Sequence, residues 1–579
     1  MSKAEKLLEL ARRRGIFWSS YEIYGGASGF YDLGPIGVLI KRNIVELWRN
    51  YFIYDNDDLV VEIETPIISP KRVFEASGHV ENFIDPIVKC NKCNKIYRAD
   101  HLVEELTKIR TEGLSPEKLN EIIKEKKIKC PNCGGELGEV KVFNLLFETR
   151  IGPYADSIGY LRPEAAQGMF TSFKRVFEAF REKLPIGIAQ VGRVARNEIS
   201  PRQGIIRMRE FTIMEIEFFY NPEETSIDIL NERGVSYDKI NILLASDKIK
   251  GNEKPVRMEV YEAVREKIIL SPWQAFWMAI ASRFITKLGI NEGKSYFEEK
   301  LPEERAHYSL QTFDQIVETE GFGKIEISGH ANRGRYDLSR HQQFSNQDMT
   351  VFIKYSEPII VKEKRIIFDR RRLYEIFKEK AEQIIEEVNK IKVEEIEDSL
   401  RTKDYITIKG YEIPKSIIKV IEEERKVSGK KIIPSVVEPS FGAERLLYVV
   451  LENAINEREG RLILSLPPSI SPYQVAVFPL LEREKLINYA INIYKLLKNY
   501  FKVFFDYTGS IGKRYARADE IGIPFSVTID PRTLNDRTLT IRDRDTWNQI
   551  RVKEEELITK LQRALKGERL ELLGEIVRE

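Results

Sequence analysis

The feature that most constrains the fold is a long strand–turn–strand pattern near the middle of the chain. AQVGRVARNE (189–198) and IIRMREFTIMEIEFF (205–219) have the residue types of strands, and the ISPRQG between them favours a turn. Two long strands joined by a short turn pair antiparallel. The chain is therefore predicted to contain a long antiparallel hairpin.

Length and composition indicate a multidomain protein. At roughly 150 residues per domain, the 579 residues correspond to about four domains. Hydrophobic residues make up 42% of the chain, enough for several cores, which excludes general disorder. The net charge is only +2, which argues against coating nucleic acid by bulk charge and leaves room for a local basic groove.

No segment has the pattern of a membrane anchor or a secretion signal. The N-terminal MSKAEKLLELARRRGIF carries charges of both signs and lacks an apolar core followed by a cleavage site. The most apolar stretch, Ile269–Ile285, is interrupted by Ser, Pro, Gln and Arg and is shorter than the roughly 20 residues of a bilayer span. We expect a buried helix there, no membrane contact and a cytoplasmic protein.

Other segments divide the chain into recognisable parts. Ile40, Ile44, Leu47 and Tyr51 have the spacing of one helix face, and the following LVVEIETPII, closed by a proline, suits an edge strand. Residues of about 225 to 320 are predicted to be mostly helical. The charged segment from about 346 to 433 is predicted to be an insertion, and the last 110 or so residues alternate in β-α-β fashion.

All four cysteines lie in two CxxC pairs, Cys90 with Cys93 and Cys130 with Cys133. Each pair can aim two thiolates at one tetrahedral ion, and zinc is the expected metal. The intervening segment is longer than in compact sites, and a helical excursion is expected to fill it. Four thiolates leave no open position on the ion, so we expect Zn²⁺ to be structural; redox or disulfide chemistry is the less favoured alternative.

The hairpin is rich in arginine. Five arginines, one glutamate and no lysine lie between Arg193 and Arg209, and the planar guanidinium group suits bidentate contact with phosphate. Strand alternation places Arg196 and Glu198 on one face, and it gives a second common face to Arg207, Arg209, Phe211, Glu215 and Glu217. This combination suits a nucleotide site; the plain alternative is a solvated hairpin with cross-strand ion pairs.

At these residues the chain resembles a known family. RNE followed by RMREF is similar to the second signature of class II aminoacyl-tRNA synthetases, and EPSFGAER (438–445) resembles the third. FYDLGPIG, EASGH, YRADH, LRPEAAQG, ANRGRYDLSRH and GSIGKRYARADEIGIPF are similar to glycyl-tRNA synthetases of the archaeal and eukaryotic type. The resemblance runs from about residue 15 to 565 and is weakest in the two inserts.

The resemblance implies a two-step ligase. Glycine and ATP would give glycyl-adenylate and pyrophosphate, and the glycyl group would pass to the 3′ end of tRNA(Gly). The implied fold is α+β: a class II antiparallel sheet flanked by helices, with a zinc-ribbon-like insert and a C-terminal α/β anticodon-binding domain. The helix that contains Ile40 to Tyr51 and the strand that ends at Pro66 resemble the first signature of the class, which implies a homodimer.

The implied division of the chain follows from these parts. The catalytic domain occupies residues 1–88, 146–345 and 434–468, interrupted by the zinc-binding insert at 89–145 and the charged insertion at 346–433. The anticodon-binding domain occupies residues 469–579.

The resemblance also implies residue roles at the ATP site. Arg196, Glu198, Arg207 and Arg445 are implied catalytic residues, with Arg196 on the α-phosphate and Arg207 and Arg445 on the β- and γ-phosphates. Phe211 would lie under adenine and Glu198 beside it. The full implied set for ATP is Arg196, Asn197, Glu198, Arg207, Met208, Phe211, Glu326, Ile327 and Arg445. Strand alternation independently turns Ile325 and Ile327 inward and Glu326 toward the cleft, where Mg²⁺ could bridge it to phosphate.

Glycine and tRNA have their own implied residues. The glycine pocket matches Glu164, Glu215, Glu438, Pro439 and Ser440; carboxylates suit a ligand whose ammonium group is its strongest handle. Candidate tRNA contacts are Lys513, Arg514, Arg517, Arg542 and Arg544. His330 and His341 have no metal spacing and are expected to make hydrogen bonds.

Two other functions remain open at this level. One is a catalytically inactive synthetase-like protein that binds nucleic acid or serves as a polymerase accessory subunit. The complete set of ATP-site residues argues against it, because a binding module needs no such set. The other is a class II synthetase for threonine, proline or serine, against which the three carboxylates argue.

Overall fold

The computed structural model describes residues 2–577 except residues 110, 112, 154–156, 200, 202 and 225. It consists of two compact units, Met1–Met349 with Pro434–Glu579, and Thr350–Ile433.

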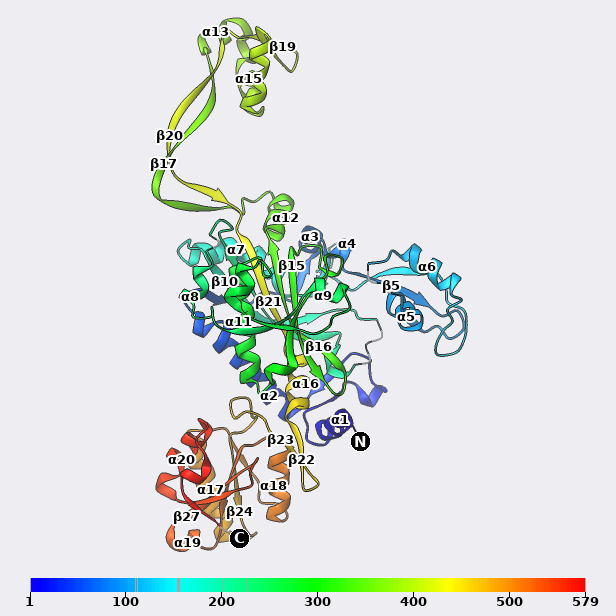
Figure 1. Ribbon diagram of the computed structural model, residues 1–579, viewed down its shortest axis with the longest axis vertical. Coiled ribbons are helices and arrows are strands. Elements are labelled where there is room, and N and C mark those ends of the chain that lie inside the picture. The colour runs from blue at the N-terminus through cyan, green and yellow to red at the C-terminus, as the bar shows by residue number, and fades with distance from the viewer. Residues whose placement is uncertain are drawn as a thin grey trace. The chain divides into compact units, whose positions relative to one another are not determined.

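The first unit is built on a nine-stranded sheet in the order β13-β12-β14-β15-β16-β21-β11-β10-β3 (Figure 1). Neighbouring strands run antiparallel except β10 with β3 and β12 with β14. The strands, in chain order, are β3 (Val60–Glu62), β10 (Ile186–Ala195), β11 (Glu210–Tyr220), β12 (Lys239–Leu243), β13 (Val256–Glu259), β14 (Ser295–Glu299), β15 (Gln311–Thr319), β16 (Gly323–Gly334) and β21 (Ser435–Gly442). The α+β prediction is confirmed.

The predicted hairpin is β10 with β11. The pairing runs without interruption from Ile186 opposite Phe219 to Ala195 opposite Glu210. β11 also pairs with β21 on its other side, so it lies inside the sheet and is buried on both faces. The predicted edge strand is also confirmed, since β3 ends the sheet beside β10.

The prediction that residues 225–320 are mostly helical is wrong. Four strands, β12 to β15, lie in or reach into this segment among the helices α8 (Asp228–Glu232), α9 (Ala245–Ile249), α10 (Val260–Arg265) and α11 (Pro272–Lys287). The strands β12, β13 and β14 are only four or five residues long. Such short runs carry little periodicity of their own and acquire their structure from pairing in the sheet.

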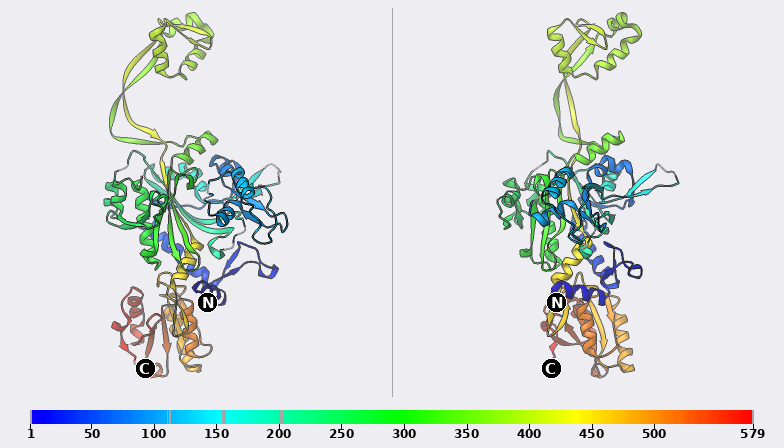
Figure 2. Two further views of the ribbon diagram at one scale, coloured as in Figure 1. Left: turned by 45° about the vertical axis from the view of Figure 1, so that its right-hand side comes forward. Right: turned by 90° about the vertical axis from the view of Figure 1, so that its right-hand side faces the viewer.

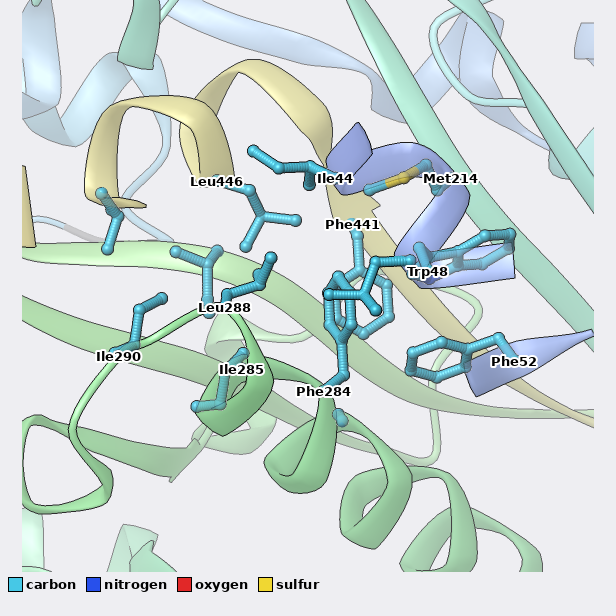
Figure 3. Packing of buried hydrophobic residues seen from close by; sticks show 14 of the residues in the cluster. Ile44, Trp48, Phe52, Met214, Phe284, Ile285, Leu288, Ile290, Phe441 and Leu446 are labelled. Carbon is cyan, nitrogen blue, oxygen red and sulfur yellow. The ribbon is translucent and has the colours of Figure 1, made fainter. Parts of the chain in front are cut away.

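An aromatic core lies on one face of the sheet, between the helices α2 (Pro35–Phe52), α11 and α16 (Ala443–Ala454). The Phe52 ring centroid is 5.0 Å from that of Phe441 on β21 and 5.8 Å from that of Trp277 on α11. Figure 3 shows Phe441 pointing between Trp48, Phe52 and Phe284. The core therefore fixes the end of β21 and the start of α16.

The apolar stretch expected to form a buried helix is α11. Twelve of its sixteen residues are buried. Within the described part of the chain, no helix combines the length and apolar character needed to cross a membrane.

Helix α7 (Ala166–Ala179) packs on β10 and β11, with the Phe173 ring 4.3 Å from that of Phe219. A small sheet precedes α7 in the chain. Its strands, in sheet order, are β4 (Ile68–Pro70), β9 (Ile158–Leu161) and β8 (Phe147–Arg150). The remaining elements of this part are α1 (Lys3–Arg13), β1 (Phe17–Ser19), β2 (Tyr31–Leu33), α3 (Lys71–Ala76), α4 (His79–Asn82) and α12 (Tyr336–Ser345).

The cysteine-containing insert has a fold of its own. It is a three-stranded sheet in the order β6-β5-β7, with a small apolar core that includes Val88, Leu102 and Leu119. The predicted helical excursion between the two CxxC pairs is present as two helices. The elements are β5 (Ile84–Lys89), β6 (Ile96–Arg98), α5 (Ala99–Thr107), α6 (Pro116–Glu125) and β7 (Lys141–Asn144).

The C-terminal part is a six-stranded mixed sheet with helices, in the order β25-β24-β26-β27-β28-β29. β24 pairs parallel with β25 and β26, as the β-α-β alternation predicted. A short hairpin, β22 (Ile455–Arg458) with β23 (Arg461–Leu464), precedes it. The elements are β24 (Val475–Pro479), α17 (Glu484–Leu497), β25 (Val503–Phe505), α18 (Ile511–Glu520), β26 (Phe525–Ile529), α19 (Thr533–Asp536), β27 (Thr538–Asp543), β28 (Gln549–Lys553), α20 (Leu557–Leu565) and β29 (Glu575–Ile576).

The second unit is a long two-stranded ribbon, β17 (Val351–Phe368) with β20 (Ile418–Ile432), carrying a small helical cap (Figure 2). Leu373, Ile384 and Ile413 belong to the apolar core of the cap. The predicted helical stretch is divided into α13 (Arg370–Phe377) and α14 (Ala381–Val388); α15 (Val393–Thr402), β18 (Tyr405–Ile408) and β19 (Tyr411–Pro414) complete the unit.

Candidate functional site

A cavity of about 440 Å³ lies over the middle of the nine-stranded sheet. Residues of β11, β15, β16 and β21 line it, together with the segments that flank them. Twelve of the residues implied for ATP and glycine share this lining: Glu164, Arg196, Glu198, Arg207, Met208, Phe211, Glu215, Glu326, Ile327, Glu438, Ser440 and Arg445.

The turn of the hairpin places cations and an aromatic ring together. Arg196 follows β10, donates from Nε to the carbonyl of Pro163 at 3.0 Å and lies 5.4 Å from the centroid of the Phe211 ring. Arg207 donates to Glu198 at 2.7 Å. Guanidinium groups beside an aromatic face suit a ligand with phosphates and a planar base.

Two residues assigned to this face by strand alternation lie elsewhere. Arg209 donates to the backbone carbonyls of Ser28 and Glu198, and it does not line the cavity. Regular pairing of β11 starts only at Glu210, so the alternation does not extend back through Arg209. Glu217 is fully buried outside the cavity lining. Arg202, another arginine of this segment, lies outside the described residues.

One region of the cavity wall is made of carboxylates. Glu215 lies opposite Ser440 in the β11–β21 pairing; its Oε1 accepts from the Ser440 hydroxyl at 2.8 Å, and its Oε2 accepts from the backbone N–H of Ala165 at 2.6 Å. Glu164 and Glu438 complete the group, and all three carboxylates are buried. A buried acidic pocket of this kind suits a small ligand with an ammonium group.

The three carboxylates differ in pKa. Burial, together with the nearby Glu438 and Glu164 carboxylates, raises the pKa of Glu215 to about 8. Burial also raises the pKa of Glu438. For Glu164 burial acts in the same direction, but His79 and Arg333 outweigh it and hold the pKa below its ordinary value.

Arg333 on β16 holds this group together, and its role was missed in the sequence. Its side chain has no exposed surface; it donates to Asp337 at 2.8 and 2.9 Å and to Glu438 at 3.0 Å, and it lies 3.5 Å from Glu164. Its guanidinium carbon lies 3.6 Å from the centroid of the Tyr308 ring. An arginine four residues before an aspartate at the strand–helix junction was the available signal.

A second cluster of charges surrounds Glu326 on β16. Arg445, at the start of α16, lies 3.3 Å from the Glu326 carboxylate and donates to the Glu326 backbone carbonyl at 3.0 Å. Ile325 and Ile327 are buried as the alternation predicted, and the Glu326 side chain faces the cavity. Lys300 and Asp314, which the sequence did not single out, line the same wall.

Asn197 and Pro439 are not part of the lining. The Asn197 backbone N–H donates to the carbonyl of Leu145 at 2.7 Å, and Pro439 lies opposite His330 in the β16–β21 pairing. The two histidines make the expected hydrogen bonds: His330 Nε2 with the Ser328 hydroxyl at 3.0 Å and His341 Nε2 with the Gln167 side chain at 2.9 Å.

The four cysteines form a separate cluster in the insert. The Sγ atoms of Cys90, Cys93, Cys130 and Cys133 all lie within 4.8 Å of one another. Cys90 is 3.5 Å from Cys133, and Cys93 is 3.7 Å from Cys130, so the two CxxC pairs meet sulfur to sulfur. Four thiols at such separations could serve as the ligand set of one tetrahedral ion.

Two protein-family models match this chain, one over the segment that contains β10 and β11 and one over the C-terminal part. Residues 155–266 match the family described as "tRNA synthetase class II core domain (G, H, P, S and T)", and residues 474–564 match "Anticodon binding domain". The chain is 52% identical to a glycine–tRNA ligase of Aeropyrum pernix, over 98% of each chain. It is 47% identical to that of Thermococcus gammatolerans and 42% identical to that of Methanocaldococcus jannaschii, each over 97% or more of both chains.

The chain belongs to the glycine–tRNA ligase family. It is therefore an aminoacyl-tRNA ligase with a class II core, and the function indicated by the sequence motifs is confirmed.

Most candidate tRNA contacts of this family member are structural residues. Arg514, Arg542 and Arg544 are buried. Arg542 pairs with Asp519 at 2.9 and 3.0 Å, Arg544 donates to the backbone carbonyls of Gly522 and Leu466, and Arg514 donates to that of Gly509. The guanidinium groups of these three arginines are therefore enclosed and hydrogen-bonded within the protein.

The other two candidates, Lys513 and Arg517, lie at the start and middle of α18. Lys513 is exposed, and the Arg517 side chain is 27% exposed beside Asp506. Both remain accessible to a phosphate.

Replacing Arg333 by methionine is expected to destabilise this ligase strongly. Asp337, Glu438 and Glu164 would lose their shared buried counter-ion, and breaking a buried ion pair costs about 3–5 kcal/mol. The matched control is Arg175→Met, since the Arg175 side chain is 89% exposed and pairs only with Glu178 at the surface, an interaction worth less than about 1 kcal/mol. Thermal unfolding should show a large decrease for the first variant and little change for the second. Equal unfolding temperatures would contradict the role of Arg333.

Proposed function

We propose that the cavity joins glycine to ATP and then passes the glycyl group to the 3′ end of tRNA(Gly). In the first step a glycine carboxylate oxygen attacks the α-phosphorus, and the bond to the β-phosphate oxygen breaks, releasing pyrophosphate. In the second step a ribose hydroxyl of the tRNA attacks the glycyl carbonyl and AMP leaves. The observation that carries the proposal is a single cavity lined by buried carboxylates and by arginines beside an aromatic ring.

The arginines are proposed to bind the triphosphate. Arg196 is assigned to the α-phosphate, where it would stabilise the charge that develops during attack. Arg207 and Arg445 are assigned to the β- and γ-phosphates, with Phe211 under adenine and Glu198 beside it. Supporting this, Arg196 and Phe211 are within contact of one another and Glu198 is already oriented by Arg207. Met208 and Ile327 supply apolar surface in the same lining.

The carboxylates Glu164, Glu215 and Glu438 are proposed to hold the glycine ammonium, with Ser440 orienting Glu215. Glycine has no side chain to recognise, so its ammonium is the main handle. A larger amino acid would be excluded by overlap with the wall, which is an easier discrimination than sensing a missing methylene, worth only about 1–3 kcal/mol.

The proposal includes one metal for the chemistry and one for the insert. Glu326 is the residue that would hold Mg²⁺, which supplies charge neutralisation for the phosphates when bound. The four cysteines would hold a structural Zn²⁺, which the separations of their sulfur atoms favour.

The remaining partner proposals concern tRNA and a second copy of the chain. Lys513 and Arg517 are proposed phosphate contacts on a domain that would recognise single-stranded bases by stacking and edge contacts. A homodimer is proposed through α2 and β3; β3 is the terminal strand of the sheet among the described residues, so its outer edge is open to pairing.

Amino-acid-dependent exchange of pyrophosphate into ATP tests the proposal. Across all twenty amino acids, glycine is expected to support exchange and the others are not. Arg196→Ala should abolish the exchange while leaving the dimer intact, because transition-state charge would lose its main partner. Arg193→Ala is the control: Arg193 lies on β10, is half-exposed and is not part of the cavity lining. It pairs with Glu210 and approaches Glu444 at 3.6 Å, and Glu444 keeps its ion pair with Lys41 at 3.0 Å in this variant. Preference for another amino acid, or normal exchange by Arg196→Ala, would contradict the proposal.

The affinity for glycine is expected to depend on pH. Only the ionised Glu215 attracts an ammonium group, and its raised pKa of about 8 leaves it mostly protonated at neutral pH. The KM for glycine should therefore fall on the order of tenfold between pH 6.5 and 8.5. Glu215→Gln should raise this KM and remove the dependence.

Glu217→Gln serves as the control on the same strand. Burial raises the Glu217 pKa well above its ordinary value, but Glu217 is buried outside the cavity lining, so its replacement should retain the pH profile of the KM for glycine. A pH-independent KM in the unmodified protein would refute the role of Glu215.

Zinc content is testable directly. Elemental analysis is expected to find one zinc per chain, and Cys93→Ser should lose it and make the insert sensitive to protease, since metal binding and folding are coupled in such sites. Lys92→Ala, an exposed non-ligand in the same turn, should keep its zinc. Absence of stoichiometric metal from the unmodified protein would exclude the site.

A further inference from the structure

Lys300 is a cation of the cavity wall to which the proposed reaction assigns no role. Lys300 follows β14 and lines the cavity, with its side chain 27% exposed. Its Nζ lies 2.8 Å from Oδ2 of Asp314 on β15, a residue that is almost fully buried. An ammonium group has three N–H donors, and Asp314 accepts one of them.

Lys300 lies at the phosphate end of the cavity. Asp314 and Ile316 are neighbours on one strand, and Ile316 lies opposite Glu326 across the β15–β16 pairing. Glu326 in turn lies 3.3 Å from Arg445, one of the arginines assigned to the β- and γ-phosphates. Burial raises the pKa of Glu326, but Arg445, Lys300 and Arg196 together outweigh it and lower that pKa. Arg445, Arg196 and Lys300 line the same cavity as Glu326, and the first two are assigned to phosphate.

The charge of Lys300 is secure at neutral pH. Burial lowers the pKa of the Lys300 ammonium, and the adjacent Asp314 carboxylate outweighs this and raises the pKa above its ordinary value. Asp314 thus keeps the lysine charged and limits the positions of its flexible side chain.

We propose that Lys300 is a phosphate-binding residue of this enzyme, contacting the β- or γ-phosphate of ATP and the pyrophosphate that leaves, with Asp314 as its positioning residue. The inference rests on the proposed function, because that function places the triphosphate at this end of the cavity. The competing explanation is that Lys300 only neutralises the buried Asp314.

A double-mutant comparison separates the two explanations. The variants are Lys300→Met, Asp314→Asn and the two combined. The measurements are the KM values for ATP, pyrophosphate and glycine in exchange, and the equilibrium affinity for Mg–ATP by calorimetry. Lys300→Met is expected to raise the KM for ATP and pyrophosphate about ten- to a hundredfold, with the KM for glycine changed less than about twofold. Lys324→Met is the control, since Lys324 lies two residues from Glu326, outside the cavity lining, and pairs with Glu253 at the surface.

The variant that combines Lys300→Met with Asp314→Asn distinguishes phosphate binding by Lys300 from mere neutralisation of Asp314. It has no unpaired buried charge, so it should fold even where Lys300→Met does not. If Lys300 binds phosphate, the combined variant keeps the weak affinity for Mg–ATP and pyrophosphate, whereas Lys300→Arg recovers part of it. Normal phosphate affinity in Lys300→Met or in the combined variant would overturn the inference. Absence of glycine-dependent exchange in the unmodified protein would instead contradict the proposed function, and calorimetry would still test Lys300.

Discussion

The ion pairing of Arg333 is the constraint on which the cavity depends. Glu164, Glu438 and Asp337 are all buried, and each would be costly without a counter-ion. A single guanidinium group contacts Asp337 and Glu438 through separate N–H donors and approaches Glu164. The pocket can therefore remain acidic while the protein stays folded, and Glu215, which has no such partner, is the carboxylate with the strongly raised pKa.

Strand alternation lets the same strands build both the site and the core. On β11 and β21, Glu215 lies opposite Ser440 and faces the cavity, and the adjacent pair, Met214 and Phe441, packs in the aromatic core with Phe52. A register shift of one residue would turn carboxylates into the core and aromatic rings into the cavity. The edge-to-face packing of Phe52 against Phe441 therefore also maintains the geometry of the acidic pocket.

The sequence predicted the features that depend on local patterns. The hairpin β10–β11, the strand–helix junction at Gly442 and the cysteine pairs each have a signal within a few residues. The strands β12, β13 and β14 were missed because they are only four or five residues long, too short to carry a periodicity of their own. The roles of Arg333 and Lys300 were missed because Glu438 and Asp314 lie on other strands, and only the fold brings these partners together. Arg542, a candidate RNA contact by resemblance alone, is paired with the buried Asp519, a partner that the sequence did not reveal.

The distribution of charge in the cavity also orients the proposed substrate. Glycine is a zwitterion, and the wall offers carboxylates at one place and arginines at another. The arginines and the carboxylates are close at one point, because Arg196 donates to the carbonyl of Pro163, the residue directly before Glu164. In the proposed function, a glycine whose ammonium contacts Glu164 would therefore bind close to the arginine that is assigned to the α-phosphate. The reverse orientation would place like charges together at both ends, so electrostatics alone selects the reactive one.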